Sequence, residues 1–331
     1  MPVEIIAEAA QGYEGNPTLA ALLVRGASSA QADAVKFQII FADELATPDY
    51  EHYALFRSLE MPPEAWAGVT QAAQRGGLRL YFDIFGERSL EQARVAAADG
   101  VKIHSSDFFN DRLVRLALER MPRVFISLGG VTLPELEAFL ARHQPSADQV
   151  CLLYGFQADP TPVALNHLRR LATLRSRFPG LSFGFMDHTD GGSEEAQLVP
   201  LLALPYGIAC LEKHISLDRS LRLEDYRSAL DPDAFGQFVG RVRHGEQALG
   251  TDRFELTQEE QAYRRKAMKS VVTTRALKPG EVVTAEAISL KRSSAGASGM
   301  AERLERIEEA MGRTVAVEVG PNQPLTKAML A

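Results

Sequence analysis

This sequence has few cysteines, no long apolar run and no excess of basic residues. Only two of its 331 residues are cysteines, Cys151 and Cys210, and both lie inside apolar runs typical of β-strands. We therefore expect buried, reduced thiols in a cytoplasmic protein rather than a disulfide. No apolar run approaches 18 residues, and the apolar stretch at 3–7 lacks the basic-then-apolar pattern of a signal peptide. We expect neither membrane insertion nor export.

The charge balance and two missing motifs narrow the function further. A net charge of −7 and a pI near 5.6 disfavour nucleic acid as a partner, because nucleic-acid binding normally needs a basic surface. No Gly-x-Gly-x-x-Gly motif follows the first apolar run and no Gly-Lys-Ser/Thr loop occurs, which disfavours a nucleotide-binding sheet. What is present, 46% hydrophobic and 24% charged residues, is the composition of a globular protein with a sizeable core.

Short apolar runs alternate with longer amphipathic segments through residues 1–250, the pattern of repeated strand-helix units. The runs that qualify as strands lie at 3–7, 34–38, 78–85, 101–104, 124–128, 150–154, 181–186 and 208–212. Helices are expected at 90–98, 133–142 and 164–177. Eight parallel strands separated by helices favour a closed (β/α)8 TIM barrel, which usually takes about 250 residues. An open parallel sheet is the structural alternative.

The pattern changes after residue 250. The charged stretch 251–266 predicts an exposed connecting helix or linker. Residues 267–331 predict a small β-rich domain, because short apolar runs at 270–274, 282–284 and 314–317 alternate with turn residues at 278–281 and 320–321. A loop at 290–296 in this domain places Arg292 beside small residues, a setting suited to binding a carboxylate or an amide-bearing ligand.

Functional side chains of a TIM barrel gather at the carboxyl ends of its strands. The ends of the predicted strands carry Glu8, Lys36, Gln38, Asp83, Lys102, Ser105, Asp107, Ser127, Tyr154, Gln157, Asp187, His188, Glu212, Lys213 and His214. A single Lys or Asp at such a place most often stabilises the fold. So many polar groups on one rim predict a binding site.

His188 and His214 are the most informative of these residues. Each ends an apolar run, and the two runs would form neighbouring strands of the barrel. Two neutral imidazoles directed at one point supply half of a metal coordination sphere and leave positions for water or a substrate oxygen. The sequence therefore predicts a divalent metal site, with two unrelated polar strand ends as the alternative.

The order and spacing of these residues resemble the sialic acid synthase (N-acetylneuraminate synthase) family over nearly the whole chain. The matching segments are Glu8, Lys36-Phe37-Gln38, Lys102-Ile103 with Ser105 and Asn110, Ser127, Pro160-Thr161-Pro162, Asp187-His188-Thr189, Glu212-Lys213-His214, Asp225 and Lys291-Arg292. Residues 267–331 resemble the family's antifreeze-like (SAF) domain. The resemblance implies a domain-swapped homodimer in which this domain lies over the partner's barrel, so that Arg292 acts in trans.

The resemblance also implies the reaction. A divalent ion held by His188 and His214, Mn²⁺ in the family with Mg²⁺ or Co²⁺ as further options, polarises the aldehyde of an open-chain amino sugar. Phosphoenolpyruvate attacks that aldehyde, giving a nonulosonic acid for surface polysaccharide. The family positions imply donor binding by Lys36, Lys102, Ser105 and Ser127, sugar or substrate contacts by Gln38, Gln157, Asp225 and Arg292, and catalytic or supporting roles for Glu8, Lys102 and Asp107.

Some positions depart from the family pattern. Asp83 stands where the family has a threonine beside the donor phosphate, and Met186 replaces a small polar residue. Gln157 also departs from the family pattern after the sixth strand. A carboxylate at position 83 would repel a phosphorylated donor by on the order of a few kcal/mol, unless it is protonated, paired with lysine or turned away. Two alternatives therefore stay open: a donor without phosphate, such as pyruvate, and a sugar-binding homologue without catalysis.

Overall fold

The computed structural model describes residues 2–293 and 303–331. The chain divides into two compact units, Met1–Gly250 and Thr251–Ala331. Each unit has its own hydrophobic core.

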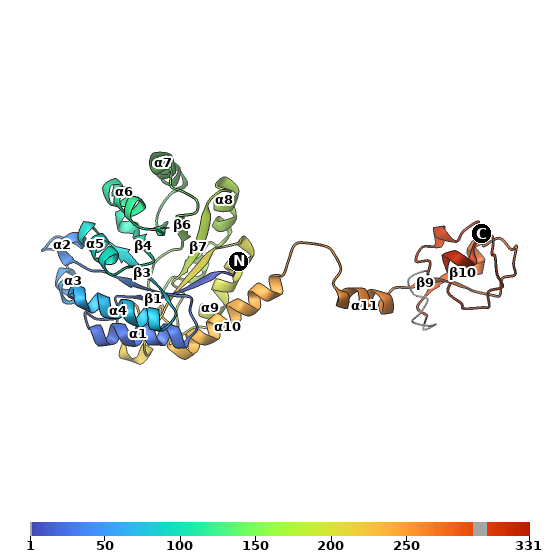
Figure 1. Cartoon of the computed structure of the whole chain (residues 1–331), viewed down its shortest axis with the longest axis horizontal. Helices are drawn as coiled ribbons and strands as arrows, with labels where there is room; N and C mark the ends of the chain where they lie inside the picture. The colour runs from blue at the N-terminus through green and yellow to red at the C-terminus, as the bar shows by residue number, and fades with distance from the viewer. Residues whose placement is uncertain (1, 294–302) are drawn as a thin grey trace. The chain divides into compact units, whose positions relative to one another are not determined.

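The first unit is a closed barrel of eight parallel strands in sequence order, and the predicted TIM barrel is confirmed. The strands are β1 (Glu4–Ala10), β2 (Ala34–Gln38), β3 (Arg79–Ile84), β4 (Gly100–Ile103), β5 (Val124–Ser127), β6 (Val150–Tyr154), β7 (Ser182–Asp187) and β8 (Cys210–His214). Figure 1 shows the helices arranged around this barrel. The open-sheet alternative is wrong, because β1 pairs with both β2 and β8.

The helices around the barrel are α1 (Pro17–Ser29), α2 (Ala42–Leu45), α3 (Tyr53–Ser58), α4 (Pro63–Arg75), α5 (Glu87–Val95), α6 (Asp111–Arg120), α7 (Leu133–His143), α8 (Arg169–Arg177), α9 (Glu195–Leu198) and α10 (Pro232–Leu249). Local signals explain several of their ends. Asn16 caps α1 and Asp231 caps α10, each directly before a proline at the first helical position. The helix predicted at 164–177 is shorter, because His167 has a φ of 45° and separates a 3-10 turn from α8.

Two layers of apolar side chains hold the barrel together. Between the strands and the outer helices, Trp66 of α4 packs edge-on against Phe82 of β3, with ring centroids 5.2 Å apart. Inside the barrel, a separate cluster that includes Tyr81, Phe125 and both cysteines fills the lower interior. Cys151 and Cys210 are free and buried, with sulfur atoms 3.6 Å apart, as the sequence predicted. This filling leaves the carboxyl ends of the strands as the place for a polar site.

The second unit begins with the exposed helix α11 (Gln258–Ala267) and continues into a small β-rich fold. Its one two-stranded sheet within the described residues pairs β9 (Ser270–Thr273) with β10 (Ile288–Lys291) in antiparallel fashion. The predicted strands at 282–284 and 314–317 form only isolated bridges, Val282 with Thr314 and Val315 with Leu330. The loop predicted from residue 290 instead starts inside β10, and its part from 294 onward lies outside the described residues.

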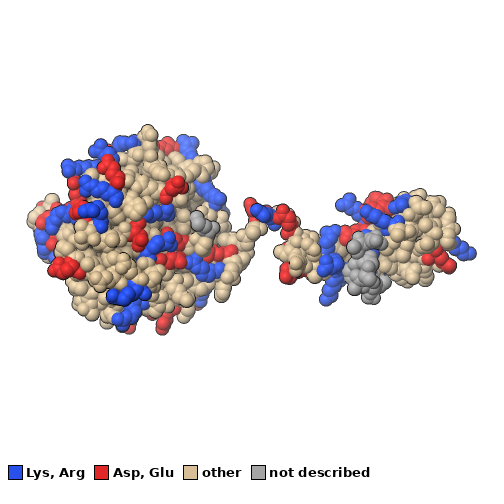
Figure 2. Space-filling model, viewed as in Figure 1, with Lys and Arg blue, Asp and Glu red and all other residues tan. Residues whose placement is uncertain are grey.

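The surface carries charges of both signs. Lys and Arg side chains are interspersed with Asp and Glu over the visible face of the barrel (Figure 2), which agrees with the lack of a basic excess in the sequence. Of the helices in the part of the chain described, none is both long and apolar enough to cross a bilayer.

Candidate active site

A cavity of about 260 Å³ opens at the carboxyl ends of the barrel strands. It is lined by Glu8, Gln11, Gln38, Leu45, Phe56, Phe85, Lys102, His104, Ser106, Gln157, Asp159, His188, Glu212, His214 and Asp225. The strand register explains why residues far apart in sequence meet here. Glu8 of β1 lies beside Lys36 of β2 on one side and beside His214 of β8 on the other, and paired residues of a sheet point to the same face.

Two buried lysines and three buried carboxylates form an ion-pair cluster at this cavity, and three of the five, Glu8, Lys102 and Glu212, line it. Lys36 contacts Glu8, and its Nζ lies 2.5 Å from Asp83 Oδ1 and 3.5 Å from Glu212 Oε2. Lys102 Nζ lies 3.1 Å from Asp83 Oδ2 and 2.9 Å from Glu212 Oε1. All five side chains are at most 2% exposed. This cluster thus holds one acidic group more than it holds basic groups.

Burial and mutual attraction shift the ionisation of these groups in opposite directions. Burial lowers the pKa of Lys36 to about 8, although Asp83 and Glu212 oppose this shift. Burial also acts to lower the pKa of Lys102, but the nearby carboxylates of Asp83 and Glu212 raise this pKa above its ordinary value. Burial would raise the pKa of Glu212, yet Lys102 and Lys36 lower it to about 2. Lys102 and Glu212 are therefore a charged pair at neutral pH.

The imidazoles of His188 and His214 face each other across the edge of the cavity. Their Nε2 atoms lie 3.2 Å apart, and the rings meet at 69°. Burial lowers the pKa of His188 to about 4 and that of His214 well below its ordinary value, so both rings are neutral, the form that binds metal. Two nitrogens about 2.1 Å from one tetrahedral ion are about 3.4 Å apart, so the observed spacing suits a shared cation.

The rest of the coordination sphere would have to come from elsewhere. Among the described residues, no group of three or more His, Cys, Asp or Glu side chains is arranged to hold a metal ion. His188 Nδ1 is buried without a hydrogen-bond partner, whereas metal-bound histidines usually donate this hydrogen to a second group. Two protein ligands would leave the remaining positions of an ion open to water or substrate, while the ring of His188 has no second partner at Nδ1 to orient it.

A second buried ion pair fixes the backbone that carries His188. Lys213 Nζ lies 2.6 Å from Asp187 Oδ2 and donates to the Thr189 carbonyl oxygen at 2.9 Å. The Thr189 hydroxyl donates to Asp187 Oδ1 at 2.6 Å. These bonds link the ends of β7 and β8, so the two histidines are held at a set separation.

Ser105, Ser127 and Gln157 bind one another. The two hydroxyl oxygens are 2.7 Å apart, and each hydroxyl donates to Gln157 Oε1, at 2.7 Å from Ser105 and 3.3 Å from Ser127. Met186 fills the space beside them, with its sulfur 4.0 Å from the Ser127 oxygen and 3.9 Å from Lys102 Nζ. Of the three, only Gln157 lines the cavity.

Gln38 and Asp225 lie on the other side of the cavity. Gln11 donates to Gln38 Oε1 at 2.8 Å. Burial, together with Asp159 and Glu224, raises the pKa of Asp225 to about 7. This side offers amide and carboxyl groups that can bind sugar hydroxyls.

Asp107, a predicted site residue of the barrel, does not line the cavity. It lies in a 3-10 turn after β4 and accepts hydrogen bonds from Ser106 at 3.0 Å and Asn110 at 2.9 Å. Arg292 belongs to the second unit, where its Nε donates to the Ala267 carbonyl oxygen at 2.9 Å. Lys36, Ser105 and Ser127 lie just behind the lining rather than in it.

Sequence reasoning missed several residues that line the cavity, among them Gln11, His104, Ser106 and Asp159. His104 directly follows β4, and burial lowers its pKa to about 4. Its position after a strand was the available signal. Gln11 directly follows β1, which runs to Ala10 rather than ending at residue 7 as predicted.

Comparisons with known proteins find relatives that cover most of the chain. Residues 23–254 match the NeuB family and residues 269–331 match the SAF domain. A pseudaminic acid synthase from Campylobacter jejuni is 28% identical, over 89% of this chain and 88% of its own. An N,N'-diacetyllegionaminic acid synthase from Legionella pneumophila is also 28% identical, over 88% and 86%. The crystal structure of a sialic acid synthetase from Leptospira borgpetersenii has a TM-score of 0.74 and 25% identity, covering 81% of this chain and 93% of that chain.

Proposed function

Because the chain belongs to the NeuB family, we propose that it condenses a three-carbon donor with an open-chain amino sugar to give a nonulosonic acid for surface polysaccharide. The relatives named as pseudaminic and legionaminic acid synthases support this class of reaction. One observation in this chain carries the proposal: two neutral, buried imidazoles share a 3.2 Å gap at the edge of a cavity that also presents Lys102.

A divalent ion, Mn²⁺ by family resemblance, would be held by His188 and His214 and would supply a Lewis acid for the aldehyde oxygen. The chain's own side chains would do the rest. Lys102 presents an ammonium group to the donor carboxylate, and Gln38 and Asp225 bind sugar hydroxyls. Leu45, Phe56 and Phe85 restrict water at the mouth.

The donor in the first candidate reaction is phosphoenolpyruvate. Its methylene carbon forms the new bond to the aldehyde carbon, water adds at the second donor carbon, and inorganic phosphate leaves. Product and phosphate therefore form in equal amounts. Lys102, which lines the cavity, is the cation available to the donor's anionic groups, and Lys36 lies just behind it.

Asp83 favours a second candidate, in which the donor is pyruvate. The two carboxylate oxygens of Asp83 lie 2.5 Å from Lys36 Nζ and 3.1 Å from Lys102 Nζ. Both lysines are therefore already paired. Ser105 and Ser127 are likewise bound to Gln157. An aldol addition of pyruvate to the aldehyde keeps every atom of both substrates and releases no phosphate.

One experiment separates these candidates. The full chain is incubated with Mn²⁺, an N-acetylhexosamine and either donor, and product is measured by mass spectrometry alongside free phosphate. Equal product and phosphate support phosphoenolpyruvate, and product from pyruvate alone supports the second candidate. Asp83→Thr should raise the use of phosphoenolpyruvate at least about tenfold by removing one negative charge.

No product from either donor with any hexosamine tested, at metal concentrations that saturate the chain, would contradict the proposed function. Sugar binding without turnover under those conditions would instead favour a non-catalytic homologue. The double variant His188→Ala/His214→Ala is the matched control, because any product that it forms does not depend on the proposed metal site.

A further inference from the structure

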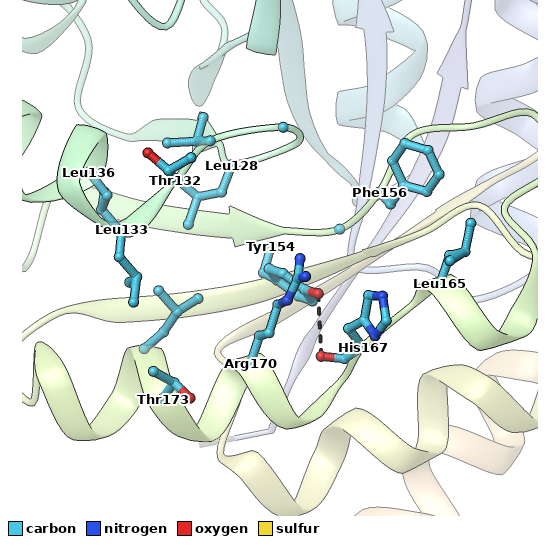
Figure 3. A pocket seen from close by; sticks show the side chains of 14 residues that line it. Leu128, Thr132, Leu133, Leu136, Tyr154, Phe156, Leu165, His167, Arg170 and Thr173 are labelled. Atoms are coloured by element: carbon cyan, nitrogen blue, oxygen red, sulfur yellow. Dashed lines mark hydrogen bonds between the residues drawn. The ribbon is translucent and has the colours of Figure 1, made fainter.

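A second and larger cavity lies outside the barrel, between α7 and α8. Its volume is about 720 Å³, within the range of small-molecule sites. Figure 3 shows Leu133 and Leu136 on one side and Arg170 and Thr173 on the other, with Tyr154 between them. None of its lining residues lines the cavity described above.

The walls of this second cavity are mostly apolar and unusually exposed. Leu133 is 41% exposed, Phe156 is 44% exposed and Leu165 is 42% exposed, although the three come from separate segments that converge on one hollow. Leu128, Leu136 and Leu174 form its buried part. Large apolar side chains gathered around a concave site mark a place where an apolar group can be buried.

Arg170 is the one permanently charged side chain among the described residues that line the cavity. Arg170 and His167 line it, and none of the described lining residues is Asp or Glu. Arg170 lies beside the Tyr154 hydroxyl and forms no ion pair within the described part of the chain. The Tyr154 hydroxyl itself donates to the Asn166 carbonyl oxygen at 2.8 Å. The guanidinium is thus the group left to meet an anion.

This cavity shares a wall with the candidate active site. Gly130 lines the cavity, while a side chain at Gly129 would come within 2.7 Å of Gln157 Oε1 and 2.9 Å of the Ser105 oxygen. Phe156, which lines the cavity, directly precedes Gln157. A ligand that orders the Leu128 to Gly130 segment would therefore act on the cluster of Ser105, Ser127 and Gln157.

We propose that the cavity between α7 and α8 binds a small organic monoanion with an aromatic or branched apolar body, its acidic group paired with Arg170. The apolar walls take up the body of the ligand, and its charge meets the one guanidinium among the described lining residues. None of its lining residues lines the candidate active site, so the proposal does not rest on the function proposed above.

The test uses the full chain and 8-anilinonaphthalene-1-sulfonate, a monoanion with aromatic rings whose fluorescence rises in an apolar site. We expect saturable binding of one probe per chain. Arg170→Ala should weaken it by about tenfold or more, because it removes a charge-assisted contact. Arg169→Ala, the neighbouring exposed arginine outside the cavity, is the matched control and should leave the affinity unchanged.

A second pair of variants tests the cavity rather than the charge. Thr173 lines the cavity and is exposed, so Thr173→Trp should fill it and abolish probe binding, whereas Ala172→Trp adds the same ring outside it.

The bound probe should also slow amide hydrogen exchange at 128–131 and 154–157. Equal affinity in Arg170→Ala and Arg169→Ala, or unchanged exchange at these segments, overturns the proposal. A loss of probe binding as the protein concentration rises also overturns the proposal, because it would show that a second protein chain occupies the cavity.

Discussion

His188 and His214 show how much of a site can depend on the direction of two side chains. Each ring is neutral because burial disfavours its charged form, and each Nε2 faces the other at 3.2 Å. One N–H···N hydrogen bond would engage both nitrogens, one as donor and the other as acceptor. A cation shared by the two nitrogens is the alternative that we propose, because their spacing suits a common ion.

We expect His188→Ala and His214→Ala each to weaken Mn²⁺ binding by at least about a hundredfold, because each removes half of the protein ligands. Isothermal titration calorimetry measures the affinity and circular dichroism checks that the fold is intact. His244→Ala, a histidine on α10 away from the cavity, is the control. Unchanged Mn²⁺ affinity in both site variants would contradict the metal proposal.

Asp225 gives a prediction about pH. Its pKa is raised in the folded chain from 3.8 to about 7, so the folded state binds more protons than the unfolded state between these values. The contribution of Asp225 to the free energy of unfolding therefore falls as pH rises from about 4 to about 7. Asp225→Asn removes this term and suits the left-handed φ of 62° at this position.

Thermal unfolding at pH 5 and pH 8 checks this expectation. The melting temperature of Asp225→Asn should rise relative to wild type as the pH goes from 5 to 8, because only the wild type then carries the buried charge. Asp252→Asn, on the exposed connecting segment, should show no such trend. If the difference in melting temperature between wild type and Asp225→Asn stays constant from pH 5 to pH 8, the pKa of Asp225 is not raised by folding.

At the level of single residues, sequence reasoning identified the histidines, Glu8 and Lys102 correctly as neighbours on one rim. Their positions follow from strand ends, which apolar runs reveal. It placed Asp107 in the same group, but the turn after β4 directs Asp107 to Ser106 and Asn110 instead. Whether a loop residue points into a cavity depends on local backbone turns that the spacing of residues does not encode.

Among the elements, β7 and β8 are joined by a buried ion pair beneath the histidines. Lys213 and Asp187 are both 0% exposed, so removal of either partner leaves an isolated charge in the core. We expect Lys213→Met to lower the free energy of unfolding by about 3–5 kcal/mol. Arg142→Ala breaks the exposed pair with Asp111 and should cost less than about 1 kcal/mol.

Urea unfolding of the 1–250 unit, followed by circular dichroism, measures both changes. The double variant Asp187→Leu/Lys213→Met should recover part of the lost stability, because neither charge then remains buried. Equal losses in Lys213→Met and Arg142→Ala would show that the pair does not hold the strands together.

The ends of helices, like the directions of loop side chains, could not be predicted from the spacing of apolar residues. Periodicity placed a single helix at 164–177, but the positive φ at His167 divides this segment. Leu165 before this break and His167 at it both line the cavity between α7 and α8. An apolar pattern predicts a helix face well, whereas a single reversed backbone angle depends on the contacts around it.

For the whole molecule, the resemblance to sialic acid synthases leads us to propose that Arg292 serves the barrel of a second copy. We therefore expect that His188→Ala and Arg292→Ala, each inactive alone, regain activity when mixed. Random exchange of subunits would give about a quarter of the wild-type rate, because half of the dimers are mixed and each has one intact site. Condensation product per chain is the measurement, and mixing two different histidine variants is the control that should restore nothing.

Some properties of this protein follow from its sequence alone. The barrel, the small β-rich domain after it and the strand ends that carry His188 and His214 could all be predicted, because the spacing of apolar residues sets which elements form. The tertiary structure decided the rest. Closure of the barrel and its register bring Asp83 between Lys36 and Lys102, join Ser105 and Ser127 to Gln157, and leave Arg170 facing an apolar cavity. These contacts join residues far apart in the chain, so they exist only once the strands are paired.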